Sequence, residues 1–356
     1  MIDARRRSRR PPITWGYDVT HHRPAGRRRA ALTLAVLTPV VAELGLGSTP
    51  MHLAFLLLLW LPIYGAGVLL IREAVRRVGG GWASLVLLGV AYELVEDGIG
   101  LQALSSPHLY GAAGWAPRLF GLNTAYWEVN VVYHVVFSVL VPIALTDLIF
   151  PAHADRPYLK RGGLVGVAVC AVVGVALLRV SVPPSQDPGY VAPAWVLLGC
   201  VAAVALLAVV ALRVLPRRAA RPLPAGPAPA PWLAAAVGAG ATLVFFALAY
   251  PAFGAKQPAF THGAWALVPM AVAALVAAGT TLLVYRWSGR RGWNDRHRIR
   301  LVGGALLAHT AYGVAGVVHT LFDRVGLAVL GLLTLALLAA LDRRRTPALP
   351  QPAAAR

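Results

Sequence analysis

Long apolar runs alternate with short polar connections along nearly the whole chain. Each run holds about 17–25 residues, the length that a helix needs to cross the hydrocarbon core of a bilayer. The pattern predicts an all-α protein, a polytopic transmembrane helical bundle of about ten spans. The expected spans are 30–47, 52–71, 82–104, 126–150, 162–180, 194–215, 232–252, 264–286, 301–322 and 325–341.

Composition agrees with a membrane protein and excludes a soluble nucleic-acid-binding domain. The 356 residues are 58% hydrophobic and only 13% charged, although the formal net charge is +19. No folded basic domain remains outside the apolar runs to hold nucleic acid, so we expect no such partner. The partner that this charge favours is the lipid bilayer, whose anionic headgroups attract a basic protein face.

The basic residues also predict the orientation in the membrane. Lysine and arginine fall in the two tails and in every second loop, including the Arg72–Arg77 stretch; the exceptions are Arg118, Arg179, Lys256 and Arg324. Because basic loops stay on the cytoplasmic side, both the N-terminus and the C-terminus are expected there. The abundance of arginine, alanine, glycine and proline is typical of a high-GC bacterium, which suggests a multi-pass protein of the cell membrane, the bacterial inner membrane.

Proline and alanine divide the chain into segments. Residues 1–29 are expected to form a basic, disordered cytoplasmic tail, and residues 342–356 a second disordered tail. Spans one to six occupy 30–215, a Pro/Ala-rich cytoplasmic linker follows at 216–231, and the remaining spans occupy 232–341.

Three acids interrupt the third apolar run. Glu93, Glu96 and Asp97 lie three and four residues apart, so they share one face of a helix. A carboxylate near the bilayer centre costs roughly 2.5–3.5 kcal/mol on the insertion scale. Three of them need a polar cavity, protonation or buried partners, and the run therefore predicts a polar site in the first half of the protein.

A histidine in the fourth run is expected at the same depth as these acids. Glu96 lies eight residues before the end of its span, and His134 eight residues after the start of the next, which places both about 12 Å below the outer face. Consecutive spans are usually neighbours, so Glu96 or Asp97 should face His134. The candidate catalytic set is Glu96 as general base, assisted by Glu93, Asp97 and His134.

Further polar residues could line the same site. Asn130 and Tyr133 precede His134 in the fourth span, and His309 and Tyr312 lie in the ninth; these four are the candidate substrate-binding residues. The outer loop 105–125 connects the acidic span to the histidine span, and it suits either a lid or a plain interfacial loop.

Three kinds of chemistry fit this set of residues. Glu96 could activate water for an intramembrane hydrolase. The same acids and histidine could take up and release protons in a proton-coupled or small-molecule transporter. The cluster could also only fix helix packing in a non-enzymatic accessory subunit. Metal chemistry has weak support because no HExxH or CxxC is present, so no metal ligand is assigned and the cofactor is unknown.

The residues resemble one known family. Glu96-Asp97 is similar to the paired acids of the CAAX-protease and bacteriocin-processing (CPBP) membrane proteins, His134 to their second motif, and His319-Thr-Leu-Phe-Asp323 to their third. Within this third motif, His319 and Asp323 are expected to form an i,i+4 pair on one helix. The resemblance implies a glutamate-activated water that attacks a peptide bond within the membrane.

Three positions depart from the CPBP pattern. Asp97 stands where that family has a second glutamate, Leu101 where it has an arginine, and Asn130 where it has a phenylalanine. The stretch from Tyr64 to Glu73, with the following Gly79-Gly-Gly-Trp82, also resembles uncharacterised actinobacterial membrane proteins, a likeness that implies no activity. The peptide or small-molecule substrate is therefore unknown from the sequence.

Overall fold

The computed structural model describes residues 26–217, 226–259 and 263–345, and the regular elements in these ranges are helices. Most of the two expected tails (residues 1–25 and 346–356) and half of the Pro/Ala-rich linker (residues 218–225) lie outside the described residues. In the elements named η the hydrogen bonding is of the π or 3-10 type.

The N-terminal part of the chain holds six long helical rods. They are α1 (Arg27–Pro39) with η1 (Val40–Leu44); η2 (Met51–Leu56), α2 (Leu57–Trp60), η3 (Leu61–Ala66) and α3 (Gly67–Arg77); α4 (Trp82–Glu93) with η4 (Leu94–Gly100); α5 (Thr124–Tyr133), η6 (His134–Leu140) and α6 (Val141–Ile149); α7 (Arg161–Ser181); and α9 (Ala194–Val209) with η8 (Val210–Val214) and η9 (Leu215–Arg217). Short helices occupy the connections: η5 (Leu109–Gly114), η7 (Pro151–His153) and α8 (Pro183–Gln186).

The C-terminal part adds four rods. They are α10 (Pro231–Ala249); η10 (Gly263–Ala266) with α11 (Leu267–Ser288); α12 (Asp295–Tyr312) with η11 (Gly313–Val317); and α13 (Leu321–Arg345). Seven helices of the described chain are long and apolar enough to cross a membrane. The rods outside that group, 27–44, 82–100 and 295–317, carry more charged residues, among them the three acids after Tyr92.

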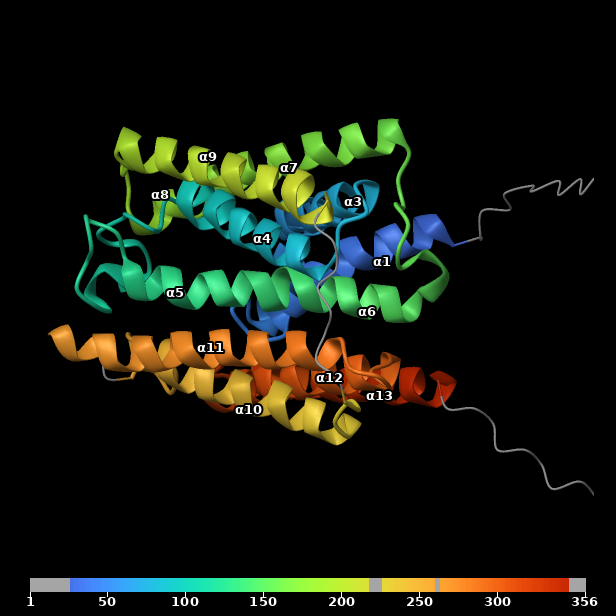
Figure 1. Ribbon diagram of the computed structural model, residues 1–356. Helices are drawn as coiled ribbons and strands as arrows, with labels where there is room; N and C mark the ends of the chain where they lie inside the picture. Colours follow the sequence, from blue (N-terminus) through green and yellow to red (C-terminus); the bar gives the residue numbers. More distant parts are fainter. Residues whose placement is uncertain (1–25, 218–225, 260–262, 346–356) are drawn as a thin grey trace, which may run out of the picture.

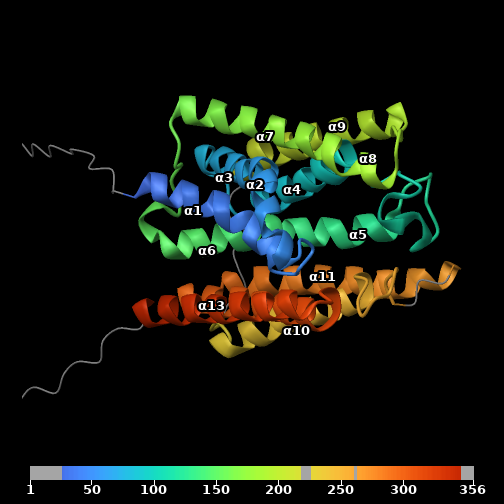
Figure 2. The same cartoon turned by 180° about the vertical axis from the view of Figure 1, so that it is seen from behind.

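The two parts lie side by side as two layers of roughly parallel rods (Figures 1 and 2). The rod of α5, η6 and α6 faces the C-terminal layer and packs on α10, α11 and α12. The start of α1 and the end of α13 lie at the same end of the bundle (Figure 1). This placement agrees with an even number of crossings.

The outermost helices expose apolar side chains. Val172 on α7, Leu198 on α9, Leu275 on α11 and Leu332 on α13 are each between 65% and 72% exposed. A soluble helical bundle buries its apolar faces and exposes polar ones, whereas several helices here expose apolar surface. Such surface suits contact with lipid tails. Burial is concentrated instead in the rods of α4, α5–α6 and α12, where the polar residues lie.

Small residues let α10 and α12 approach closely. A Cβ added at Gly238 would lie 2.4 Å from the Leu301 carbonyl oxygen, and one at Gly304 would lie 2.1 Å from the Ala235 carbonyl oxygen. The two backbones therefore touch at this crossing, as small-residue interfaces in membranes allow.

Arg72 near the end of α3 holds the connection after α6 in place. Its guanidinium is fully buried and donates to one Asp147 carboxylate oxygen at 2.8 and 3.2 Å. It also donates to the carbonyls of His153, Ala154 and Arg156, all between 2.9 and 3.1 Å away. The Arg72–Arg77 stretch, counted from the sequence among the basic loops, therefore contains a buried ionic network.

Glu73 extends this network to the next residues of the connection. Its carboxylate accepts hydrogen bonds from the backbone N–H groups of Tyr158 and Leu159 and from the Arg77 guanidinium. The Tyr158 ring lies 3.5 Å below the carbon of the Arg72 guanidinium. Burial raises the pKa of the Tyr158 phenol, so this ring stays neutral under the cation.

The turn between the ninth and tenth rods differs from the sequence prediction. Residue 317 ends η11 and Leu321 begins α13, so His319 lies in the turn and is exposed. Asp323 accepts hydrogen bonds from the Thr320 hydroxyl at 2.6 Å and from the His52 ring at 3.0 Å. The expected i,i+4 pair of His319 and Asp323 is therefore wrong, because helix capping ends one rod and begins another between them.

Candidate functional site

Polar side chains gather where four π-helical segments meet in the N-terminal layer. These segments are η1, η3, η4 and η6, and each continues an α-helix on at least one side. The polar or acidic residues that they contribute are Glu43, Tyr64, Glu96, Asp97, His134 and Ser138. Single π turns inside α-helices are rare and are frequent at functional sites.

His134 lies between two carboxylates of the neighbouring rod. Its Nδ1 is 3.6 Å from Glu96 Oε2, and its Nε2 is 3.4 Å from Asp97 Oδ2. The same Nδ1 is 3.0 Å from the Ser138 hydroxyl, one turn further along the helix. His134, Glu96 and Asp97 are all at most 4% exposed. The expectation that the acids of the third run face the histidine of the fourth is confirmed.

Two aromatic side chains of α5 donate to the acids. The Tyr126 hydroxyl donates to Asp97 Oδ1 at 2.9 Å, and Trp127 Nε1 donates to Glu93 Oε2 at 3.0 Å. Glu93 is fully buried. Each of these acids therefore has one oxygen bonded to the opposite rod and one oxygen left over.

The oxygens left over have no hydrogen-bond partner. Glu93 Oε1, Glu96 Oε2 and Asp97 Oδ2 are buried without one, and so is the hydroxyl of Tyr92. A buried polar atom without a partner costs about 1–3 kcal/mol, and more when the group is charged. These oxygens could therefore accept a hydrogen bond from a proton-bearing neighbour, a water molecule or a ligand.

Glu43, which is not among the candidate residues taken from the sequence, belongs to the same site. The residue is half-buried, and its Oε2 accepts a hydrogen bond from the Thr49 hydroxyl at 2.8 Å. Its carboxyl interacts electrostatically with His134 and with Asp97. The first rod ends at Leu44 and the chain turns back over 45–50, which keeps Glu43 inside the bundle.

The charges in this site do not balance. Glu43, Glu93, Glu96 and Asp97 contribute carboxyls, and within the described parts of the chain the only basic side chain in an ion pair with any of them is His134. One imidazolium can offset one carboxylate. The other acids need protons or another cation, because isolated buried charges are very costly.

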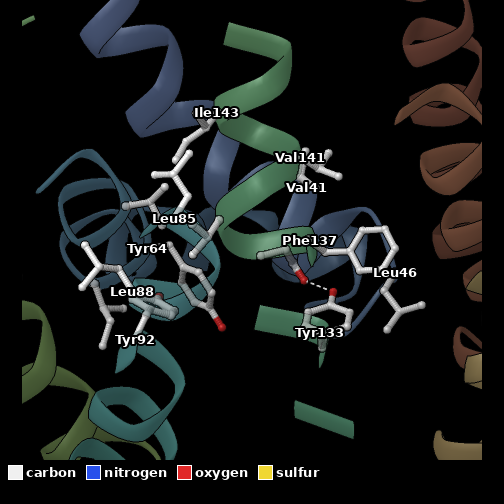
Figure 3. Packing of buried hydrophobic residues seen from close by; sticks show 14 of the residues in the cluster. Val41, Leu46, Tyr64, Leu85, Leu88, Tyr92, Tyr133, Phe137, Val141 and Ile143 are labelled. Carbon is white, nitrogen blue, oxygen red and sulfur yellow. Dashed lines mark hydrogen bonds between the residues drawn. The ribbon is translucent and has the colours of Figure 1, made fainter. Parts of the chain in front are cut away.

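Aromatic rings surround the histidine. The ring centroids of Tyr64, Tyr92 and Tyr133 lie 6.2, 5.7 and 5.8 Å from that of His134. Figure 3 shows Tyr64 and Tyr92 on one side of the rod of α5, η6 and α6, and Phe137 on the other. The site is thus acidic in charge and aromatic in its walls.

The outer loop 105–125 is folded against the helices. Trp115 is buried, and its Nε1 donates to the Lys256 carbonyl at 3.2 Å. The Tyr110 ring stacks on Tyr126 at 5.9 Å, and Trp115 packs on the same ring at 5.7 Å. Because Tyr126 in turn bonds Asp97, the loop covers one side of the acidic site.

The candidate substrate-binding residues divide between this site and a second cluster. The Asn130 amide donates to the Tyr126 carbonyl in its own helix at 2.9 Å, and this bond points it along that helix. The Tyr133 hydroxyl donates to the Ala42 carbonyl and lies 3.2 Å from His309 Nε2. Figure 3 draws the bond from the Tyr133 hydroxyl to the Ala42 carbonyl as a dashed line.

His309 and Tyr312 lie among aromatic rings rather than among the carboxylates. His309 is fully buried and stacks on Phe137 at 4.2 Å. The Tyr312 hydroxyl donates to the carbonyls of Phe246 and Tyr250 at 3.0 Å each. Tyr133 is thus the connection between the acidic site and this aromatic cluster, which joins the two layers.

Comparison with known proteins identifies a family. A family model described as "Uncharacterized membrane protein family" matches residues 32–345. No curated protein and no solved structure matches the chain.

In the ranges that the structure describes, no group of three or more histidine, cysteine, aspartate or glutamate side chains could hold a metal ion.

Proposed function

The chain belongs to this uncharacterized family of membrane proteins, and from that premise we propose that it is a proton-coupled membrane carrier. It is a multi-pass membrane protein, and the acidic site would bind and release the coupling protons. Ten crossings with both termini in the cytoplasm are part of the proposal. They are supported by the ten rods, by the shared end of the first and last helices, and by the positive-inside rule.

The observation that carries the proposal is the set of unpartnered carboxylate oxygens around His134. A carboxylate can only accept hydrogen bonds, whereas a protonated carboxyl can also donate one. Glu96 Oε2 and Asp97 Oδ2 face the ring nitrogens of His134 at 3.6 and 3.4 Å, and neither oxygen makes a hydrogen bond of normal geometry. A proton held in this group would satisfy these atoms and reduce the excess of negative charge.

Buried acids with a histidine inside a membrane protein are the usual parts of a proton relay. Glu43 extends the group to a third rod, so protons could pass between η4, η6 and η1 through side chains that interact electrostatically. The π turns that carry these residues are places where a helix can rearrange its hydrogen bonds, as alternating access requires.

Infrared difference spectroscopy of the purified protein at acidic and alkaline pH tests the proposal. We expect a carboxyl band that gains and loses intensity with pH and that is reduced in Glu96→Gln and in Asp97→Asn. Asp295→Asn, in an exposed ion pair of α12, is the matched control and should leave the band unchanged. If the substitutions lower thermal stability and leave proton binding intact, the acids serve packing alone and the proposal is wrong.

An intramembrane hydrolase is the second candidate. It is favoured by Glu96 and His134, which face each other from neighbouring rods and leave an acceptor free for a water molecule. The third CPBP-like motif does not support it, because His319 is exposed and Asp323 bonds His52. Cleavage of a fluorogenic peptide library in proteoliposomes, abolished by Glu96→Gln, would favour the hydrolase.

A further inference from the structure

The charge of the acidic site limits the class of ligand that it can take. Glu93, Glu96 and Asp97 supply unpartnered acceptor oxygens, and their only cationic neighbour by ion pairing in the described residues is His134. An anionic ligand would meet repulsion here. A cation would be attracted, and it would replace protons that otherwise neutralise the acids.

The walls of the site favour an organic cation over a metal ion. In the described ranges no set of side chains is arranged to ligate a metal. The rings of Tyr64 and Tyr92 lie beside His134, and Tyr126, which bonds Asp97, is covered by Tyr110 and Trp115. Aromatic faces attract organic cations through the ring quadrupole and cover their apolar substituents, and tryptophan and tyrosine are strong in this role.

An independent feature indicates that the group is built for a ligand. Tyr92 is 6% exposed, and its buried hydroxyl makes no hydrogen bond of normal geometry. Buried hydroxyls in protein cores normally have a partner. An acidic cluster used only for packing would satisfy this hydroxyl internally.

We infer that the acidic site binds a hydrophobic organic cation, whose positive centre lies among Glu96, Asp97 and the tyrosine rings under the 105–125 loop. The inference rests on the proposed carrier function and names the class of its substrate. Charge balance then sets the coupling: a bound cation replaces protons on the carboxyls, so the protein exchanges the cation for protons. The Trp115 ring would cover the outer side of the bound cation, because it packs on Tyr126.

Tetraphenylphosphonium is the probe that tests this inference on the purified full chain. We expect saturable binding that weakens as the pH falls and that releases protons into a weakly buffered solution. Glu96→Gln and Trp115→Leu should each weaken binding by about tenfold or more, since each removes a charge or ring contact. Trp232→Leu removes an exposed tryptophan from α10 and is the matched control.

The neutral analogue triphenylphosphine oxide gives the opposing arm. It should not compete with tetraphenylphosphonium, because it lacks the positive charge. Equal binding of both compounds, or no saturable binding of the cation, would overturn the inference. Trp115→Leu lies in the outer loop, so it provides a second variant if Glu96→Gln does not fold.

The two proposals fail in distinguishable ways. If the pH-dependent carboxyl band is present and tetraphenylphosphonium does not bind, the cation inference is wrong and the proton site stands. If the band is absent and the cation binds without proton release, the site holds cations and the coupling is wrong. If both are absent, both proposals are wrong.

Discussion

The Arg72 guanidinium donates twice to one oxygen of Asp147, from Nη2 at 2.8 Å and from Nε at 3.2 Å. The Arg72 side chain is fully buried. The second Asp147 oxygen accepts from Arg76 at 2.9 Å. One aspartate thus bonds two arginines at the end of α3 that is nearest the start of α1. Forming such a pair adds little net stability, whereas removing one partner leaves a buried charge uncompensated.

Asp147→Ala should therefore lower the free energy of unfolding by about 3–5 kcal/mol. Equilibrium unfolding in detergent measures this loss. Asp295→Ala is the control, because Asp295 is in partly exposed ion pairs with Arg298 and Arg345 and should cost at most about 1 kcal/mol. Similar losses in the two variants would show that the buried network has no special role.

The crossing of α10 and α12 should depend on one glycine and not on its neighbour. A Cβ at Gly238 would lie 2.4 Å from the Leu301 carbonyl, whereas one at Gly240 meets nothing within 4 Å. We expect Gly238→Val to push the helices apart at a cost of about 1–3 kcal/mol or more, and Gly240→Val to be nearly neutral. Thermal unfolding of both variants in one detergent compares them, and equal melting temperatures would contradict the close contact.

Thr320 should stabilise the start of α13. Its hydroxyl oxygen accepts from the Asp323 N–H at 3.1 Å, as an N-cap residue does. Thr320→Ala should cost about 0.5–2 kcal/mol, and Thr320→Ser should retain most of the stability. Thr281→Ala removes an exposed hydroxyl bonded within α11 and is expected to change stability by less than about 0.5 kcal/mol. A loss in Thr320→Ser as large as in Thr320→Ala would argue against capping.

Tyr126→Phe should destabilise the acidic site. It removes the donor to Asp97 Oδ1 and leaves both oxygens of that buried carboxyl without a partner, at a cost of about 1–3 kcal/mol. Adding Asp97→Asn in a double-mutant cycle should recover part of this loss, since the neutral amide is cheaper to bury. Tyr285→Phe, at an exposed position of α11, is the control. Strictly additive losses would show that the two side chains do not interact.

The fold was largely predictable because apolar run length has one strong cause, the thickness of the bilayer. The predicted spans correspond to the observed rods, with boundary shifts such as α13, which begins at Leu321 and continues to Arg345. The meeting of Glu96 with His134 was also predictable, since equal depth in consecutive helices brings residues together. The roles of these residues stay predictions.

Long-range pairings were not predictable in the same way. Asp147 is bound by an arginine 75 positions away, and nothing local in the sequence selects that partner. Glu43 was missed because it is the turn of the chain over residues 45–50, after η1, that brings this residue inside the bundle. The capping of α13 was predictable, because Thr320 followed three residues later by an acid is a helix-start signal. The CPBP-like motif instead assigned a pairing to His319.

The π turns make the acidic site sensitive to chain length as well as to composition. Each such turn holds one more residue than an α-helix needs, and one residue rotates a helix by about 100°. Deleting a single apolar residue within η4 or η6 would leave the rod continuous and equally hydrophobic, yet it would swing every later side chain by that angle. Two proteins of this family with the same acids and histidine can therefore differ in whether those groups meet, through a gap of one position in their alignment.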